Sequence, residues 1–288
     1  MATERFAVQV PVQPWFRDHC FNHRVIFPAV EGMRLLALTA QTAHPELDVR
    51  RMHQGRFAKF LEIPPESAEL AVLVELEQEE NDRVCVRLLS KKNLKTMTRM
   101  TTHCELSFVA GPLHGGMEVE VVPSCSSAGF VMEVSAEQVY RELVPFGPFY
   151  RTLQGRLFLA RDFARGTLLA PDVPLPSSDP IGSPFPLDGA MHAACVHGQR
   201  LVDFIPFPVG FAARIIHKPT RAGGQYFVHV RLQSHATDEL VYDLLIFDQA
   251  EQLRETVTGL RMRDVSGGRV KPPAWIRSPL DAEGKLFD

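Results

Sequence analysis

The apolar positions along the chain form two similar series of predicted elements. In the first half, a short apolar-rich run ending near Val12 indicates a strand. An almost wholly apolar stretch then begins at Ala29, with Pro28 before it and Glu31 in its first turn, and predicts a helix enclosed by other elements. Segments rich in Val, Leu, Phe and Thr predict strands at residues 56–63, 70–78, 83–90 and 96–109.

The second half repeats this order. Helical spacing occurs at residues 135–143, and a second apolar helix is predicted from about Leu187 to Leu201. Strand patterns lie at residues 154–160, 165–170, 209–217, 225–234, 239–247 and 252–263. Because Phe-Pro precedes both apolar helices and the element order matches, we infer two similar units, residues 1–125 and 126–288, that join near residues 124–128.

Composition and charge narrow the functional classes. The 288 residues are 45% hydrophobic and 23% charged, which is typical of a globular protein. A net charge of −3 provides no basic field for nucleic acid. Five irregularly spaced cysteines argue against a secreted disulfide scaffold, and no apolar run is long enough to span a membrane. With no signal-peptide pattern at the N-terminus, we expect a cytoplasmic protein without nucleic-acid or membrane partners.

Two histidine-containing motifs could carry chemistry. His19 and His23 are four residues apart, a spacing that suits a metal site only on a helix, and nothing nearby predicts one. The alternatives are a neutral base in a dry pocket and a buried, hydrogen-bonded structural histidine. Asp188 and His192 lie at the start of the second apolar helix, where an aspartate commonly caps the helix. Apolar neighbours could also desolvate Asp188 and raise its pKa.

Two further segments are turns with aromatic residues: residues 146–150 (Phe-Gly-Pro-Phe-Tyr) and residues 205–209 (Ile-Pro-Phe-Pro-Val). Together with the two histidine motifs they resemble, in order and spacing, the dehydratase domains of modular polyketide synthases. That family carries H-x-x-x-G-x-x-x-x-P, Y-G-P-x-F, D-x-x-x-Q or D-x-x-x-H, and L-P-F-x-W. The matching residues are His19, Pro28, Gly147, Pro148, Asp188, His192, Pro206 and Phe207.

The resemblance implies an α+β double-hotdog fold, in which two antiparallel sheets are each wrapped around a central helix. It implies a 3-hydroxyacyl thioester on the phosphopantetheine arm of an acyl carrier protein as substrate, with no other cofactor and no metal. His19 would remove the α-proton, Asp188 would protonate the departing β-hydroxyl, and His192 would orient Asp188. The further residues that would bind the substrate or support the site are His23, Pro28, Gly147, Pro148, Tyr150 and Phe207. Other synthase domains and a second copy of the chain are the further partners implied.

Two departures from the family pattern keep other functions open. His23 stands where the family has glycine, and Phe146 stands where it has tyrosine, so a hydroxyl near Asp188 is missing unless Tyr150 replaces it. The alternatives are a free-standing or lipid-pathway relative, a double-bond isomerase or cyclase of the same fold, and a non-catalytic acyl-binding or scaffold module. The basic run from Arg83 to Arg99 could dock an acidic carrier or pair with acidic residues across strands.

Overall fold

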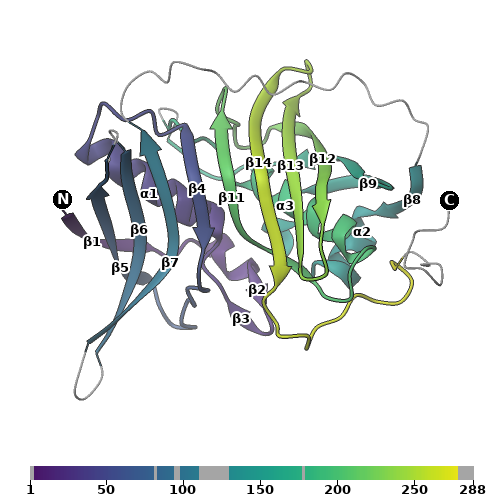
Figure 1. Cartoon of the computed structure of the whole chain (residues 1–288), viewed down its shortest axis with the longest axis horizontal. Helices are drawn as coiled ribbons and strands as arrows, with labels where there is room; N and C mark the ends of the chain where they lie inside the picture. Colours follow the sequence, from purple (N-terminus) through teal and green to yellow (C-terminus); the bar gives the residue numbers. More distant parts are fainter. Residues whose placement is uncertain (1–2, 81–82, 94–97, 110–129, 177–178, 278–288) are drawn as a thin grey trace.

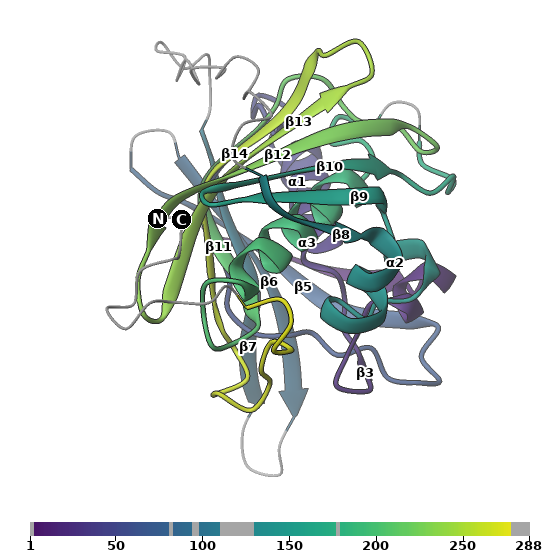
Figure 2. The same cartoon turned by 90° about the vertical axis from the view of Figure 1, so that its right-hand side faces the viewer.

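The computed structural model describes residues 3–80, 83–93, 98–109, 130–176 and 179–277. Two helices, α1 (Ala29–Ala43) and α3 (Phe185–Gln199), lie along one face of a single antiparallel sheet (Figure 1). Figure 2 shows that the sheet curves around α3. The α+β double-hotdog fold is therefore confirmed, whereas the predicted junction at residues 124–128 lies outside the described residues.

The first half contributes α1 and one side of the sheet. Its strands in the sheet are β1 (Thr3–Pro11), β4 (Arg51–Phe57), β5 (Glu69–Gln78), β6 (Arg83–Asn93) and β7 (Thr98–Val109). Between β1 and α1 the chain forms a 3-10 turn, η1 (Pro14–Asp18), and a small hairpin of β2 (Cys20–Phe21) and β3 (Arg24–Val25). The hairpin begins directly after His19.

The second half contributes α3 and the other side of the sheet. Its strands are β8 (Phe130–Ser135), β9 (Leu153–Ala160), β10 (Phe163–Leu169), β11 (Pro206–Ile216), β12 (Gln225–His235), β13 (Glu239–Asp248) and β14 (Leu253–Asp264). The connection from β8 to β9 contains α2 (Ala136–Gln138), a π turn η2 (Val139–Leu143) and a 3-10 turn η3 (Pro148–Tyr150). All residues of α3 are buried, as expected for an enclosed helix, whereas α1 exposes part of its surface.

The two expected sheets are joined edge to edge into one. β4 of the first half pairs with β11 of the second half, and Gly55 lies opposite Phe211. A Cβ atom at position 55 would overlap the Phe211 ring, so this pairing requires glycine. Near the joint, the buried guanidinium of Arg214 donates from Nε to Glu255 Oε1 at 2.7 Å. The close backbone approach thus fixes the joint, and the buried ion pair holds β11 to β14 within the second half.

The strand predicted at residues 56–63 is misplaced, because β4 runs from Arg51 to Phe57. Polar outward-facing side chains and the left-handed backbone of Gln54 (φ 52°) obscure the alternation of β4 in the sequence. After Phe57 the chain leaves the sheet and packs against residues 25–27, where Phe27 N donates to Leu61 O at 2.8 Å. The apolar side chains of residues 57–61 therefore line a cavity instead of continuing a strand.

In the second half, the structure differs from the sequence prediction in two smaller ways. The sequence pattern did not predict β8, and only residues 136–138 of the helix expected at 135–143 are α-helical. The remainder, Val139–Leu143, is a π turn, which rotates the following side chains relative to an α-helix. Tyr140, on this turn, consequently faces α3.

In the basic run from Arg83 to Arg99, Arg87 pairs with acidic residues across strands. Arg87 of β6 contacts Glu77 at 2.5 Å, Glu105 at 2.6 Å and Glu75 at 3.2 Å on the neighbouring strands β5 and β7. Lys95 of the same run lies outside the described residues. For Arg87, at least, the cross-strand alternative agrees with the structure.

Candidate active site

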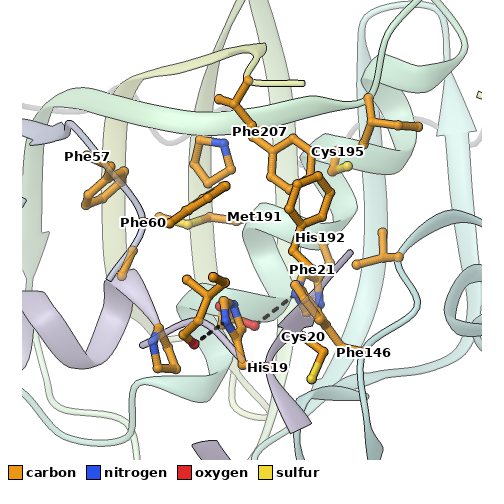
Figure 3. A pocket seen from close by; sticks show the side chains of 18 of the residues that line it. His19, Cys20, Phe21, Phe57, Phe60, Phe146, Met191, His192, Cys195 and Phe207 are labelled. Carbon is orange, nitrogen blue, oxygen red and sulfur yellow. Dashed lines mark hydrogen bonds and ion pairs between the residues drawn. The ribbon is translucent and has the colours of Figure 1, made fainter. Parts of the chain in front are cut away.

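One cavity of about 520 Å³ lies between the two halves. The first half lines it with residues 19–22, the start of α1 and residues 57–61; the second half lines it with residues 142–146, residues 205–208 and one face of α3. Figure 3 shows aromatic side chains on several sides of this cavity, with His19 and His192 next to one another. The walls are mainly apolar, so a polar group inside the cavity is poorly solvated.

His19 follows the 3-10 turn η1, and its ring is fixed on one side by the backbone. Its Nδ1 lies 2.9 Å from the carbonyl oxygen of Ile26, which can only accept, so we assign the proton to Nδ1 and a free lone pair to Nε2. The Phe146 ring stacks on the imidazole at 4.5 Å, and the Tyr150 ring meets its edge at 5.0 Å. Burial lowers the pKa of His19, although the negative charge of Asp188 acts in the opposite direction. The ring is therefore a neutral base near pH 7.

Asp188 lies in the first turn of α3 and is only 6% exposed. Its Oδ2 atom is 2.9 Å from Nε2 of His192, one turn further along the helix. The two atoms are in close contact but off-line for a hydrogen bond, and neither has an aligned partner among the described residues. Burial alone would raise the pKa of Asp188, but His192 and His19 together outweigh burial and lower it. The resting form of this carboxyl group is thus the carboxylate.

His19 and Asp188 line the same cavity although they come from opposite halves of the chain. Each affects the pKa of the other through its charge, which indicates that they lie close together within a poorly solvated space. The sequence predicted both residues but could not place them together. The arrangement can take a proton at the imidazole and hold a hydroxyl group at the carboxylate.

Some of the other predicted site residues line the cavity, and the others support it. Pro28 lines the cavity at the start of α1, and Phe207 lines it from β11. The Phe207 ring packs on Phe21 at 4.6 Å and on Phe60 at 6.2 Å, so the three aromatic rings form one cluster. Sequence analysis missed Phe21 and Phe60, because they belong to irregular segments without a helical or strand period.

Gly147, Pro148 and Tyr150 support the cavity from behind and do not line it. Gly147 N donates to Asp18 O at 2.8 Å, and a Cβ atom at position 147 would overlap the Asp18 side chain. The Gly-Pro turn therefore holds the second half against the segment that carries His19. The Tyr150 hydroxyl is buried and has no hydrogen-bond partner among the described residues.

His23 is exposed and does not line the cavity. Its backbone is left-handed, with φ 62°, a conformation that glycine adopts more easily than any other residue. The glycine of the resembling family motif therefore suits the turn at this position, and a histidine there does not place a ring in the cavity.

Other site types receive no support from the described part of the chain. Within it, no group of three His, Cys, Asp or Glu side chains converges as metal ligands would. No helix in the described ranges has the length and apolar character needed to cross a membrane.

In comparisons with known proteins, only solved structures are similar to this chain. No family model matches the sequence, and no curated protein matches it. The dehydratase domain from the CurJ module of the curacin polyketide synthase is 15% identical, with a TM-score of 0.70 over 91% of both chains. A trans-AT polyketide synthase dehydratase domain from Brevibacillus brevis is 17% identical, with a TM-score of 0.71 over 92% of this chain and 94% of that one.

A third similar structure was solved with a bound acyl thioester. It is the dehydratase domain of PpsC from Mycobacterium tuberculosis in complex with C12:1-CoA, and it is 17% identical with a TM-score of 0.68 over 91% of this chain and 93% of that one. At these identities the likeness concerns the fold. The chain has the double-hotdog fold of polyketide synthase dehydratase domains.

Proposed function

We propose that this protein is a dehydratase that removes water from a 3-hydroxyacyl thioester and leaves the 2-enoyl thioester. The observation that carries the proposal is the pair formed by neutral His19 and ionised Asp188, which line one apolar cavity from opposite halves. Such a pair can remove a proton and hold a leaving hydroxyl on the same substrate. The similar fold of several dehydratase domains supports the proposal.

In the proposed reaction, Nε2 of His19 takes the proton from the α-carbon of the substrate. The electrons of that C–H bond form the double bond as the bond between the β-carbon and the hydroxyl breaks. Once the substrate has displaced water from the cavity, desolvation favours the protonated form of Asp188, which takes up a proton from solvent and gives it to the departing oxygen; this oxygen leaves as water. His19 then returns the proton that it removed, through solvent, to Asp188. The first N–H groups of α1, at Ala29 beside the cavity, are the candidates that stabilise the thioester oxygen.

The walls of the cavity favour an apolar acyl chain. The cluster of Phe21, Phe60 and Phe207 and the sulfur-containing side chains Met191 and Cys195 offer no charged partner to a polar chain. We place the substrate on the phosphopantetheine arm of an acyl carrier protein, in the cytoplasm. Other synthase domains and a second copy of the chain are further expected partners.

The test follows a short 3-hydroxyacyl pantetheine thioester by its enoyl absorbance, and the reverse hydration of the enoyl thioester. His19→Ala and Asp188→Asn should each lower turnover by about 10²–10⁴-fold, because each removes one proton-transfer group. His53→Ala is the matched control, since His53 is a partly buried histidine of the first half that does not line the cavity. No turnover by the folded wild-type protein, on free or carrier-bound substrates of several chain lengths, would reject the dehydratase.

A double-bond isomerase is the second candidate, and the ionised state of Asp188 favours it. An isomerase moves a proton between carbon atoms and needs no acid for a leaving hydroxyl, so His19 with a fixed carboxylate would suffice. The same protein incubated with a 2-enoyl thioester would then give the 3-enoyl product without hydration. A cyclase or a non-catalytic acyl-binding module would show neither reaction.

A further inference from the structure

A buried tyrosine hydroxyl lies behind the carboxylate–histidine pair. Tyr140, on the π turn η2, is only 4% exposed, and its oxygen lies 3.4 Å from Nδ1 of His192. The backbone N–H of Leu153 donates to the same oxygen at 2.8 Å. On its other side, His192 faces Asp188 through Nε2. Tyr140, His192 and Asp188 thus form one continuous row that ends in the cavity.

The backbone N–H of Leu153 can only donate, whereas the direction of the contact between Tyr140 and His192 depends on the tautomer of His192. The Tyr140 oxygen already accepts from Leu153, and its own hydrogen remains available to donate. Burial and the nearby charge of Asp188 both raise the pKa of Tyr140, so the phenol keeps its proton. A hydroxyl that donates to Nδ1 requires the neutral imidazole to carry its proton on Nε2, the atom that faces Asp188.

We propose that Tyr140 is a positioning residue that fixes His192 in the tautomer with its proton on Nε2, the atom that faces Asp188. The inference rests on the proposed function, because this N–H would orient the Asp188 carboxyl group that serves the leaving hydroxyl. Phe146 carries no hydroxyl, and the Tyr150 hydroxyl does not reach the cavity. Tyr140 therefore supplies, through His192, a hydroxyl that neither of these residues can provide. The contact is long at 3.4 Å, and such bonds commonly tighten when substrate is bound.

The first test reads the tautomer directly and does not depend on activity. In protein labelled with ¹⁵N-histidine, the shifts of the two ring nitrogens of His192 distinguish the tautomers. The wild type should show a protonated Nε2 and an unprotonated, hydrogen-bonded Nδ1, and Tyr140→Phe should shift this signal toward a mixture. A ring protonated on Nδ1, a doubly protonated ring at neutral pH, or an unchanged signal in Tyr140→Phe would each overturn the inference.

The matched control is Tyr242→Phe. Tyr242 is also buried, and its hydroxyl contacts Nδ1 of another α3 histidine, His197, at 3.0 Å, away from the cavity. Removing this hydroxyl should leave the His192 signal and the dehydration rate unchanged. A change of the same size in both variants would assign the effect to loosening of α3 and contradict a specific role for Tyr140.

The second test is kinetic. Tyr140→Phe should lower kcat roughly tenfold, the loss of one hydrogen bond to a polarised group, with KM changed less than about twofold. In a His192→Gln background the same substitution should have almost no further effect on kcat, because an amide has no tautomer to fix. Additive losses in the double variant would contradict the inference. A wild-type protein without turnover would reject the proposed function, while the ¹⁵N comparison would still decide the role of Tyr140.

Discussion

At the scale of single residues, the environment of His19 suits a proton acceptor. The Ile26 carbonyl fixes one nitrogen, the Phe146 ring covers one face of the imidazole, and burial keeps the ring neutral. The carboxylate of Asp188 opposes this last effect, since it raises the pKa of His19. The proton affinity of the base is thus a balance between desolvation and one nearby charge.

This balance predicts the pH behaviour of His19. Its NMR titration should give a pKa below 6.5, the ordinary value, and the acid limb of the kcat/KM profile should lie below pH 6.5 as well. Asp188→Asn removes the charge that raises the pKa, so the His19 titration should move to still lower pH in that variant. A His19 pKa above 6.5, or an upward shift in Asp188→Asn, would contradict the assignment.

Motif spacing predicted some of the site residues and missed others. The spacing of the four motifs predicted His19, Asp188 and His192, because each of them matches a position in a short motif of the family that the chain resembles. It could not predict Tyr140, which is 52 residues from His192 and approaches it only because residues 139–143 form a π turn. It also assigned His23 to the site, whereas the left-handed turn exposes that side chain.

At the scale of elements, the position of Asp188 depends on how closely α3 packs against the sheet. Gly189, the next residue, faces β10 and the residue before β9: a Cβ atom there would overlap Thr152 Oγ1 and lie 2.8 Å from Leu168 Cδ2. The corresponding glycine of α1, Gly32, has its nearest neighbour at 3.6 Å from the same hypothetical atom. The two glycines therefore have different reasons to be present.

Alanine at these two glycines should have opposite effects. Gly189→Ala should lower the free energy of unfolding by about 1–3 kcal/mol, the usual cost of overpacking, and should displace the first turn of α3. Gly32→Ala should leave it unchanged or raise it by up to about 1 kcal/mol, because alanine favours helix and ordinary contact distances remain. Urea unfolding of both variants beside the wild type measures the difference. A Gly189→Ala variant as stable as wild type would contradict the close packing of α3.

Elements were predicted well where burial gave a clear period. Both long helices and most of the strands after them follow from such periods, since one face of each strand meets a helix. β4 was misplaced because its outward-facing residues are charged and the apolar residues that follow it line a cavity instead of the sheet. A period reports burial and cannot distinguish burial in a core from burial around a substrate.

At the scale of the whole molecule, several histidines are wholly or partly buried in the neutral form. Burial lowers the pKa of His197 to about 3 and that of His229 to about 4, and it also lowers the pKa values of His53 and His103. His197, which is wholly buried on α3, contacts the Tyr242 hydroxyl and the Ala160 carbonyl. Below pH 6.5 these groups bind protons more readily in the unfolded chain than in the folded one.

The protein should therefore lose stability as the pH falls below 6.5. The folded pKa of His197 is lower than the unfolded value, so its contribution is complete above pH 6.5 and decreases by up to about 1.4 kcal/mol per pH unit below it. Urea unfolding at pH 7.5, 6.5, 5.5 and 4.5 should show this slope, and His197→Gln should reduce it. A free energy of unfolding that is constant between pH 6.5 and 4.5 would contradict the buried neutral histidines.

The pairing of β4 with β11 also sets the distance between the two groups of the proposed reaction. An antiparallel strand can slip and keep its apolar face inward only in steps of two residues, about 7 Å. His19 belongs to one side of the joint and Asp188 to the other, so a single such step would separate them by more than the span of a three-carbon substrate segment. The Gly55–Phe211 contact excludes neighbouring registers, because other residues of β4 have a Cβ atom that the Phe211 ring would meet. A glycine without chemistry of its own thus sets the distance across which a proton would travel.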